Sequence, residues 1–300
     1  MKKLFLISSN AGASEYKFSK DYIEDIYKSH GKVSEIIVRD TSYKGHLEEI
    51  VRDFLASDYK DKAIIVLGGD GSLNEVANLC VGHDVAIGLI PTGTGNDFAK
   101  NFNYRDFKIE DTFNMAIRPI DLIKINDRYC VNVTSLGFDT EVLKSAYDYL
   151  KKDKSIGKKA YLLAVKDRIK HLSYQNLNMN LHLVDGSRIH LEDDFLISAL
   201  CNGGYYGSGF NPAADARIDD GVLNLVVAYK FPKWNLIPLI VKYKNGKHQS
   251  SKYIDEFKVV SGIIRSNESF LANNDGEIFV DKKIEFEIAP NALNWAYFNK

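Results

Sequence analysis

Short apolar runs alternate with amphipathic stretches over the first 90 residues. The runs are nearly continuous in hydrophobic residues, as Ile64-Ile65-Val66-Leu67 illustrates, and such runs are typical of strands buried on both faces. Strands that alternate with helices predict a parallel sheet covered by helices on both sides. The expected strands are residues 3–7, 35–38, 63–67 and 85–90, and the expected helices are residues 14–29, 43–56 and 72–80.

From about Ile120 onward strand-like runs dominate, and one basic helical segment, about residues 140–171, interrupts them. Many short strands separated by turn signals predict an antiparallel β-sandwich. We therefore expect an α/β lobe at residues 1–119 and a β-sandwich lobe at residues 120–289. The expected strands are residues 121–125, 129–134, 178–184, 194–200, 222–228, 253–261 and 283–289, and the turn dipeptides are Asp185-Gly186, Asp220-Gly221, Asn245-Gly246 and Asp275-Gly276.

Composition narrows the classes of partner. There are 39 Lys and Arg against 40 Asp and Glu, and the resulting net charge of −1 gives no overall attraction to nucleic acid, which we do not expect as a partner. The three cysteines lie far apart, as is typical of reduced thiols in a cytosolic protein, and the seven histidines show no metal-ligand spacing. No run approaches the roughly 20 apolar residues that span a bilayer. We expect a cytoplasmic protein that meets a membrane only from outside.

A glycine-rich loop, Gly68-Gly69-Asp70-Gly71-Ser72, directly follows the buried strand at residues 63–67. We expect Ser72 to be the N-cap of a helix that contains Asn74 and Glu75. Glycines let the backbone approach a ligand, and a helix N-terminus offers free N–H groups to phosphate. The alternative is a tight strand-to-helix turn that needs glycine only for its geometry.

A second glycine-rich loop, Pro91-Thr92-Gly93-Thr94-Gly95-Asn96-Asp97, follows the strand at residues 85–90. Because the carboxyl ends of parallel strands share one sheet edge, both loops are expected to form one cleft. Backbone N–H groups can donate hydrogen bonds to phosphate oxygens. The carboxylates of Asp70 and Asp97 can bind the Mg²⁺ that neutralises the charge of the phosphates. Walker, dinucleotide-binding and protein-kinase motifs are absent, which disfavours those classes. The alternative is that the two glycine-rich loops are unrelated turns that do not form a common site.

Together these motifs resemble the diacylglycerol kinase catalytic-domain family, in particular its bacterial soluble lipid kinases. The resemblance covers nearly the whole chain. Beyond the two glycine-rich loops, it includes Val131-Asn132-Val133, Gly137-Phe138-Asp139, Asn202-Gly203, Tyr206-Gly207, Asp219-Asp220-Gly221 and Asp275-Gly276-Glu277.

The resemblance implies roles that the residues alone do not establish. Asp275, which composition alone places in a hairpin turn, becomes the general base, with Glu277 in a supporting charge network. Asp220, with carbonyl oxygens of Ile218 and Val222, is implied to hold a structural Mg²⁺, where the residues alone indicate a turn. The implied nucleotide contacts are Asn10, Gly12, Thr41, Gly68, Gly69, Asp70, Gly71, Ser72, Asn74, Glu75, Thr92, Gly93, Thr94, Asn96 and Asp97; Thr41 taken alone indicates a helix N-cap.

The expected function is transfer of the γ-phosphate of ATP, with Mg²⁺, to a lipid hydroxyl, with diacylglycerol as the leading acceptor and phosphatidate as the product. ATP is expected between the lobes, and about residues 290–300 are expected to return to the first lobe. The rival interpretations are an NAD kinase or phosphofructokinase with a Gly-Gly-Asp-Gly loop, and a nucleotide-sensing regulator without turnover.

Three further features leave alternatives open. The basic segment at residues 144–170 is either a surface that contacts anionic lipid headgroups or a solvated helix face covering the sandwich. The loop at residues 202–210 either lines the lipid or phosphate side of the cleft or is a flexible connection. Exposed strand edges would permit a homodimer.

Overall fold

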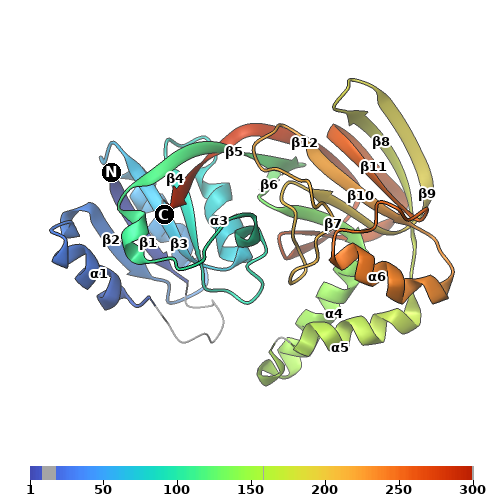
Figure 1. Ribbon diagram of the computed structural model, residues 1–300, viewed down its shortest axis with the longest axis horizontal. Coiled ribbons are helices and arrows are strands. Elements are labelled where there is room, and N and C mark those ends of the chain that lie inside the picture. The colour runs from blue at the N-terminus through green and yellow to red at the C-terminus, as the bar shows by residue number, and fades with distance from the viewer. Residues whose placement is uncertain (9–17, 158, 299–300) are drawn as a thin grey trace. The chain divides into compact units, whose positions relative to one another are not determined.

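The computed structural model describes residues 1–8, 18–157 and 159–298, and its chain divides into two compact units. Unit 1 comprises Met1–Leu122 and Pro290–Lys300, and unit 2 comprises Ile123–Ala289. The chain leaves unit 1 along β5 (Met115–Ile125) and returns along β12 (Glu277–Phe298) (Figure 1). None of the helices in these described ranges is long and apolar enough to cross a membrane.

Unit 1 is built on four parallel strands in the order β4-β3-β1-β2, and the end of β12 adds to β4 in parallel. Alternate residues of each strand face opposite sides of the sheet, and both sides are buried, as the apolar runs require. The predicted parallel α/β lobe is confirmed. The strands are β1 (Lys2–Ile7), β2 (Ile36–Asp40), β3 (Lys62–Gly68) and β4 (Ala86–Pro91).

Three helices cover this sheet: α1 (Lys20–Ser29), α2 (His46–Ala56) and α3 (Asp70–Cys80). Ser19 caps α1 through a bond from the Tyr22 N–H to its hydroxyl, and the predicted residues 14–17 lie outside the described ranges. The predicted N-cap at Ser72 is wrong, because α3 already begins at Asp70 and Gly69 occupies the N-cap position. The glycine-rich motif therefore forms the first turn of the helix itself.

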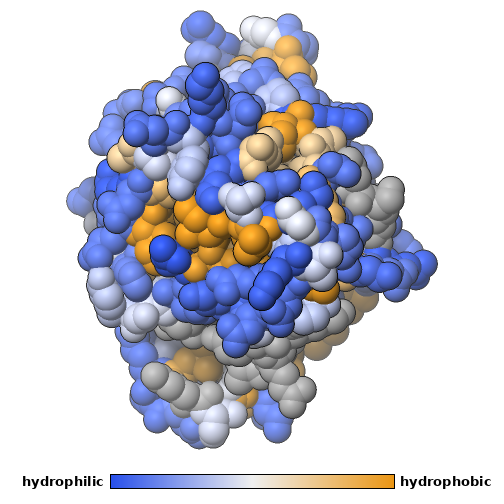
Figure 2. Space-filling model, turned by 90° about the vertical axis from the view of Figure 1, so that its left-hand side faces the viewer, coloured by the Kyte–Doolittle hydropathy of each residue, from blue (hydrophilic) through white to orange (hydrophobic). Residues whose placement is uncertain are grey.

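The face seen from the left-hand side of Figure 1 is mostly hydrophilic but carries a compact hydrophobic area (Figure 2). Apolar areas on an otherwise polar surface often mark protein contacts. β2 is the edge strand of the unit 1 sheet. A homodimer nevertheless stays a prediction.

Unit 2 is the predicted antiparallel sandwich, and its long strands take part in several pairings. β11 pairs in turn with β10, β8, β7 and β12, while β9 pairs with β8, β7 and β10. The inward side chains form one large apolar core that includes Leu177, Phe195, Leu225 and Phe286. The remaining strands are β6 (Arg128–Cys130), β7 (Val133–Gly137), β8 (Gln175–Leu183), β9 (Arg188–Cys201), β10 (Leu223–Tyr229) and β11 (Ile254–Asn274).

Two sequence expectations for unit 2 need correction. The expected strand at residues 129–134 is broken between β6 and β7, where backbone N–H groups turn to a carboxylate. The expected single helix at residues 140–171 is two helices, α4 (Phe138–Lys152) and α5 (Lys159–Arg168).

A further helix, α6 (Leu236–Lys244), was not expected. Its apolar residues run almost without interruption and include Pro238, so no helical period can be read from them. The dipeptide Asn245-Gly246 ends this helix, with Gly246 at a φ of 62°. Leu236, Leu239 and Tyr243 pack with residues of α4 and α5 in a second apolar cluster of unit 2.

Candidate active site

The carboxyl ends of the parallel strands of unit 1 meet at one sheet edge. The Thr41 N–H donates to the Ile7 carbonyl over 2.9 Å, and the Thr92 N–H donates to the Gly68 carbonyl over 3.0 Å. Thr41 is buried at the end of β2, so its place at this edge suits the implied nucleotide contact. Asn10 and Gly12 lie outside the described residues.

The two glycine-rich loops touch each other directly. A Cβ atom built on Gly93 would lie 2.5 Å from the Gly69 Cα, a distance that real Cβ atoms essentially never show. Asn96 adopts a left-handed φ of 49°, and its side-chain amide donates to the Gly93 carbonyl over 2.8 Å. Close backbone packing therefore explains the glycines at positions 69 and 93.

Asp70 joins the two loops electrostatically. Its two carboxylate oxygens accept the backbone N–H groups of Asp97, over 2.9 Å, and Phe98, over 3.0 Å. Burial raises the pKa of Asp70 despite these bonds. Asp97 is buried and pairs with Lys100. The Asp70 carboxylate therefore holds the second glycine-rich loop against the first.

The remaining predicted nucleotide residues differ in exposure. Ser72 donates its hydroxyl hydrogen to the Ser8 hydroxyl over 3.0 Å, and Asn74 is buried. Thr94 and Glu75 are exposed. No group of three or more His, Cys, Asp or Glu side chains within the described residues forms a metal cluster, and the magnesium role of Asp70 and Asp97 stays a prediction.

Asp275 occupies the tip of the hairpin between β11 and β12. Asp275 and Gly276 both have positive φ, 47° and 96°, as a two-residue hairpin turn requires. The Asp275 carboxylate accepts the consecutive backbone N–H groups of Val131, Asn132 and Val133 over 2.7 to 3.2 Å. Burial raises its pKa to about 6, and these N–H groups limit the rise.

Glu277 is exposed and lies 3.6 Å from Arg128, which is a weak surface ion pair. Asp220 accepts the Val222 N–H over 3.1 Å, the pattern of an aspartate turn, and Asp219 pairs with Arg217. The structural magnesium site at Asp220, Ile218 and Val222 therefore stays a prediction.

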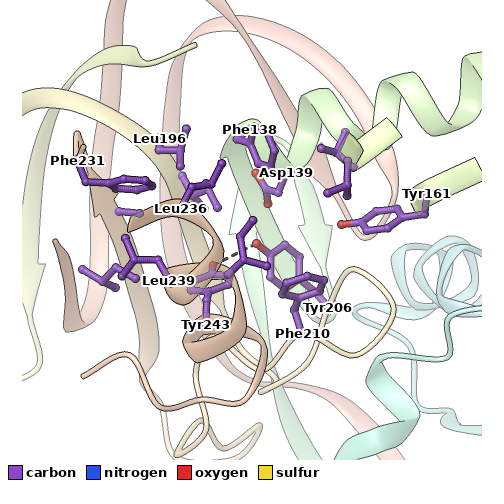
Figure 3. A pocket seen from close by; sticks show the side chains of 16 residues that line it. Phe138, Asp139, Tyr161, Leu196, Tyr206, Phe210, Phe231, Leu236, Leu239 and Tyr243 are labelled. Carbon is purple, nitrogen blue, oxygen red and sulfur yellow. Dashed lines mark hydrogen bonds between the residues drawn. The ribbon is translucent and has the colours of Figure 1, made fainter. Parts of the chain in front are cut away.

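A mostly apolar cavity of about 60 Å³ lies within unit 2, between the sandwich and its helices (Figure 3). Its polar lining groups are one carboxylate, Asp139, and the tyrosines Tyr161, Tyr206 and Tyr243. The hydroxyls of Tyr206 and Tyr243 lie 3.1 Å apart. The apolar lining residues are Phe138, Val142, Val165, Leu196, Ile197, Phe210, Ala228, Phe231, Leu236, Leu239, Ile240 and Ile254.

Asp139 is the unusual group of this cavity. Both of its carboxylate oxygens are shielded from solvent, and neither has a hydrogen-bond partner in the described parts of the chain. Burial raises its pKa to about 6, although the Ser135 and Tyr206 hydroxyls lie close enough to counter part of the rise. An ionised carboxylate in an apolar cavity is costly unless a ligand pairs with it.

Gly137 fixes the position of this carboxylate. It has a φ of 103°, and a Cβ atom there would lie 2.3 Å from the Leu196 carbonyl oxygen. Glycine therefore lets β7 run close to β9 and begin α4 at once, with Asp139 in its first turn.

Neither Asp139 nor Tyr243 has a role that is predicted from the sequence, and Tyr206 belongs to the loop predicted either to line the cleft or to be a flexible connection. The run Gly137-Phe138-Asp139 and the loop at residues 202–210 were the available signals, and Tyr206 and Phe210 of that loop do line the cavity. Nothing in the sequence places Tyr243 beside them.

A parallel α/β unit with two joined glycine loops, followed by a β-sandwich with a buried hairpin carboxylate, is the arrangement expected of the diacylglycerol kinase superfamily. Residues 2–125 match the family described as "Diacylglycerol kinase catalytic domain". Residues 132–297 match the "YegS C-terminal NAD kinase beta sandwich-like domain".

The chain belongs to the YegS-like lipid kinase family. It is 30% identical to a Cronobacter sakazakii protein named "Probable lipid kinase YegS-like", over 86% of this chain and 85% of that one. A Shewanella frigidimarina protein with the same name is 29% identical over 77% and 75% of the two chains. A Bacillus anthracis structure named "putative diacylglycerol kinase" has a TM-score of 0.75, at 21% identity over 99% and 96% of the chains, which is a likeness of fold. The predicted class of enzyme is confirmed.

Proposed function

We propose that this enzyme transfers the γ-phosphate of ATP to the hydroxyl of a membrane lipid, with diacylglycerol as the leading acceptor and phosphatidate as the product. The acceptor oxygen forms a bond to the γ-phosphorus, the bond from that phosphorus to the bridging oxygen breaks, and ADP leaves. The hydroxyl proton passes to a carboxylate. The observation that carries the proposal is the apolar cavity with a few polar groups, because such a cavity suits a lipid better than a sugar or a nucleotide.

The joined glycine loops of unit 1 are proposed to hold the ATP phosphates. Gly69 and Gly93 leave the backbone open to close approach, and the first turn of α3 offers N–H groups to phosphate oxygens. Asp97 and Asp70 are the carboxylates that would hold Mg²⁺, which would offset the phosphate charge. Asp70 already uses both oxygens for the second loop, so we expect it to act through water.

Asp275 is proposed as the general base. Its pKa of about 6 leaves it ionised at neutral pH yet basic enough to accept a proton in the transition state. The N–H groups of Val131, Asn132 and Val133 hold the carboxylate in one orientation. The ion pair between Glu277 and Arg128 is exposed, so we expect Glu277 to contribute little to the rate.

The cavity of unit 2 is proposed to receive the apolar part of the acceptor. Its volume of about 60 Å³ is smaller than an acyl chain needs, so the lining side chains of α5 and α6 must part when a lipid enters. Asp139 favours a second candidate acceptor. A buried carboxylate needs a hydrogen-bond donor, which monoacylglycerol or a sphingoid base supplies beyond the reacting hydroxyl and diacylglycerol does not.

Transfer of radiolabelled phosphate from ATP tests the proposal. The acceptors are diacylglycerol, monoacylglycerol, a sphingoid base and ceramide in mixed micelles, with NAD as the rival substrate and with magnesium omitted as the control. Labelled lipid only with magnesium supports the proposal. Labelled NAD, or ATP binding without any transfer, would replace it with one of the rival interpretations.

Action from the cytoplasmic side through peripheral contact with the membrane is part of the proposal. The proposal also includes a homodimer, and light scattering of the purified protein measures the molecular mass that distinguishes a dimer from a monomer.

A further inference from the structure

Helix α6 has two apolar faces. Leu236, Leu239 and Tyr243 point inward and line the cavity, as Figure 3 shows. On the opposite side Ile237 is 67% exposed and Val241 is 54% exposed. A surface helix of a globular protein normally turns polar residues outward, so the outer face of α6 requires an explanation.

Trp234 extends this outer face. It lies in the short 3₁₀ helix (Lys233–Asn235) that leads into α6, and it is 79% exposed. Its spacing of three and seven residues from Ile237 and Val241 places the three side chains on one stripe. We call Trp234, Ile237 and Val241 the outer stripe of α6. A tryptophan beside aliphatic residues is typical of an element at a membrane interface, because the indole is apolar with one polar end.

The segment that carries the outer stripe is rich in positive charge, although its Lys230 pairs with Asp194 of β9 over 3.9 Å. Residues 222–254 contain no Asp or Glu, and all six of their lysines are exposed. In the helix, Lys242 and Lys244 lie on either side of the outer stripe, since successive residues are about 100° apart around the axis. The other four are Lys230, Lys233, Lys247 and Lys252.

The basic segment at residues 144–170 lacks this arrangement. Its eight lysines and one arginine stand with three aspartates, and the structure pairs Lys144 with Asp148, Lys170 with Asp167 and Arg168 with Glu141, which lies just before the segment. Two neighbouring aliphatic side chains are exposed there, Leu162 at 70% and Leu163 at 41%. Three of the basic residues of that segment are therefore paired with acidic side chains, whereas residues 222–254 contain no Asp or Glu of their own.

We propose that α6 and its 3₁₀ lead-in are the membrane-docking element of this enzyme, and that their occupant is the surface of a bilayer rich in anionic phospholipid. The outer stripe enters the interface between headgroups and acyl chains, and the lysines contact the headgroups. Because the inner face of the same helix lines the cavity, docking brings the cavity to the lipid phase. This last step rests on the proposed function, whereas the docking itself does not.

The native tryptophans provide a direct test. The chain has two, and Trp295 is fully buried in unit 1, so a change in fluorescence on binding reports Trp234. With vesicles of phosphatidylglycerol and phosphatidylcholine we expect a blue shift and quenching by brominated lipid. With vesicles of phosphatidylcholine alone we expect binding to be at least tenfold weaker, since each lysine near an anionic surface raises the affinity roughly fivefold.

The paired variants are Ile237→Glu with Val241→Glu on α6, and Leu162→Ser on α5 as the matched control. We expect the first to weaken vesicle binding at least tenfold and the second to change it less than twofold. Circular dichroism and thermal unfolding check that each variant folds. Should a variant fail to fold, Lys242→Ser with Lys244→Ser tests the same face and should weaken binding at least tenfold.

Several outcomes would overturn the proposal: sedimentation with vesicles without a Trp234 signal, a larger loss from Leu162→Ser, or equal binding to neutral vesicles. A dimer that the α6 variant dissociates would assign the outer stripe to a second copy of the chain instead. Vesicle binding in the absence of any lipid phosphorylation would leave the docking element in place and remove only the proposed function.

Discussion

The glycine-loop edge of unit 1 and the apolar cavity of unit 2 use carboxylates in opposite ways. Asp70 is satisfied by backbone N–H groups from a neighbouring loop, within a framework where Gly69 and Gly93 almost touch. Asp139 makes no hydrogen bond among the described residues, although the hydroxyls of Ser135 and Tyr206 lie near it. The first arrangement is rigid before any ligand binds, whereas the second becomes favourable when a ligand supplies a donor.

Asp275 belongs to unit 2 but resembles Asp70 in its bonding. It shares with Asp139 a pKa raised to about 6 by burial, yet three backbone N–H groups hold it. Equal pKa values therefore do not mean equal roles. A carboxylate held by donors has a fixed orientation, as a base requires, while an unpaired one is suited to recognition.

The largest effect is expected from replacing Asp275. Asp275→Asn should lower kcat about 10³-fold while ATP binding is retained, since an amide cannot accept the proton and general base catalysis is typically worth 10² to 10⁴. The wild-type rate should rise with pH through about 6 and level off above it. Steady-state kinetics and nucleotide titration measure both effects.

Asp185→Asn is the matched control, because Asp185 also lies in an aspartate-glycine hairpin turn but accepts the N–H and the hydroxyl of its near neighbour Ser187. Its rate should be close to that of the wild type. A near-normal rate for Asp275→Asn would show that Asp275 takes no part in catalysis. A loss of rate that the loss of folding stability fully explains would show that its role is structural only.

A smaller but substantial effect is expected where the glycine loops touch. Gly93→Ala places a Cβ atom 2.5 Å from the Gly69 Cα, so the loops must separate. We expect unfolding free energy to fall by about 1–3 kcal/mol, as for other overpacked sites. ATP affinity should fall roughly tenfold or more because the N–H groups lose their positions.

Gly71→Ala serves for comparison, since its Cβ atom meets nothing within 4 Å. Its loss of stability should be much smaller, which urea unfolding can resolve. Unchanged ATP binding in Gly93→Ala would mean that the two loops do not form the nucleotide site.

The smallest effect on turnover is expected at Asp139, where stability and recognition should change in opposite directions. Its pKa is about 6 when folded and about 3.8 when unfolded, so the folded state binds more protons between these values and loses stability as pH rises through them. Asp139→Asn has no such charge, so at pH 7.5 its free energy of unfolding should exceed that of the wild type by about 1–3 kcal/mol. At pH 4, where Asp139 of the folded wild type is protonated, the difference should be small.

The same variant should bind monoacylglycerol or a sphingoid base roughly tenfold more weakly, because a charged acceptor of hydrogen bonds is lost. Diacylglycerol should be affected least. Urea unfolding at the two pH values and KM for each acceptor measure these effects. A variant that is less stable at pH 7.5 would show that Asp139 is already paired in the folded protein.

Local signals in the sequence were enough to predict the α/β lobe and the sandwich. Nearly continuous apolar runs ending in Gly68 and Pro91 predicted buried parallel strands, and that arrangement puts both loops at one edge whatever the rest of the chain does. The dipeptide Asp275-Gly276 predicted its turn for the same local reason, since only certain residues tolerate positive φ.

Only the tertiary structure decided what these residues meet. The N–H groups that hold Asp275 lie 142 to 144 residues earlier in the chain, and no local pattern records that pairing. The cavity around Asp139 needs α4, α5 and α6 together, and α6 has no readable period because apolar residues face both the cavity and the surface. Burial and hydrogen bonding depend on segments far apart in sequence, whereas strand, turn and helix preferences depend on neighbours.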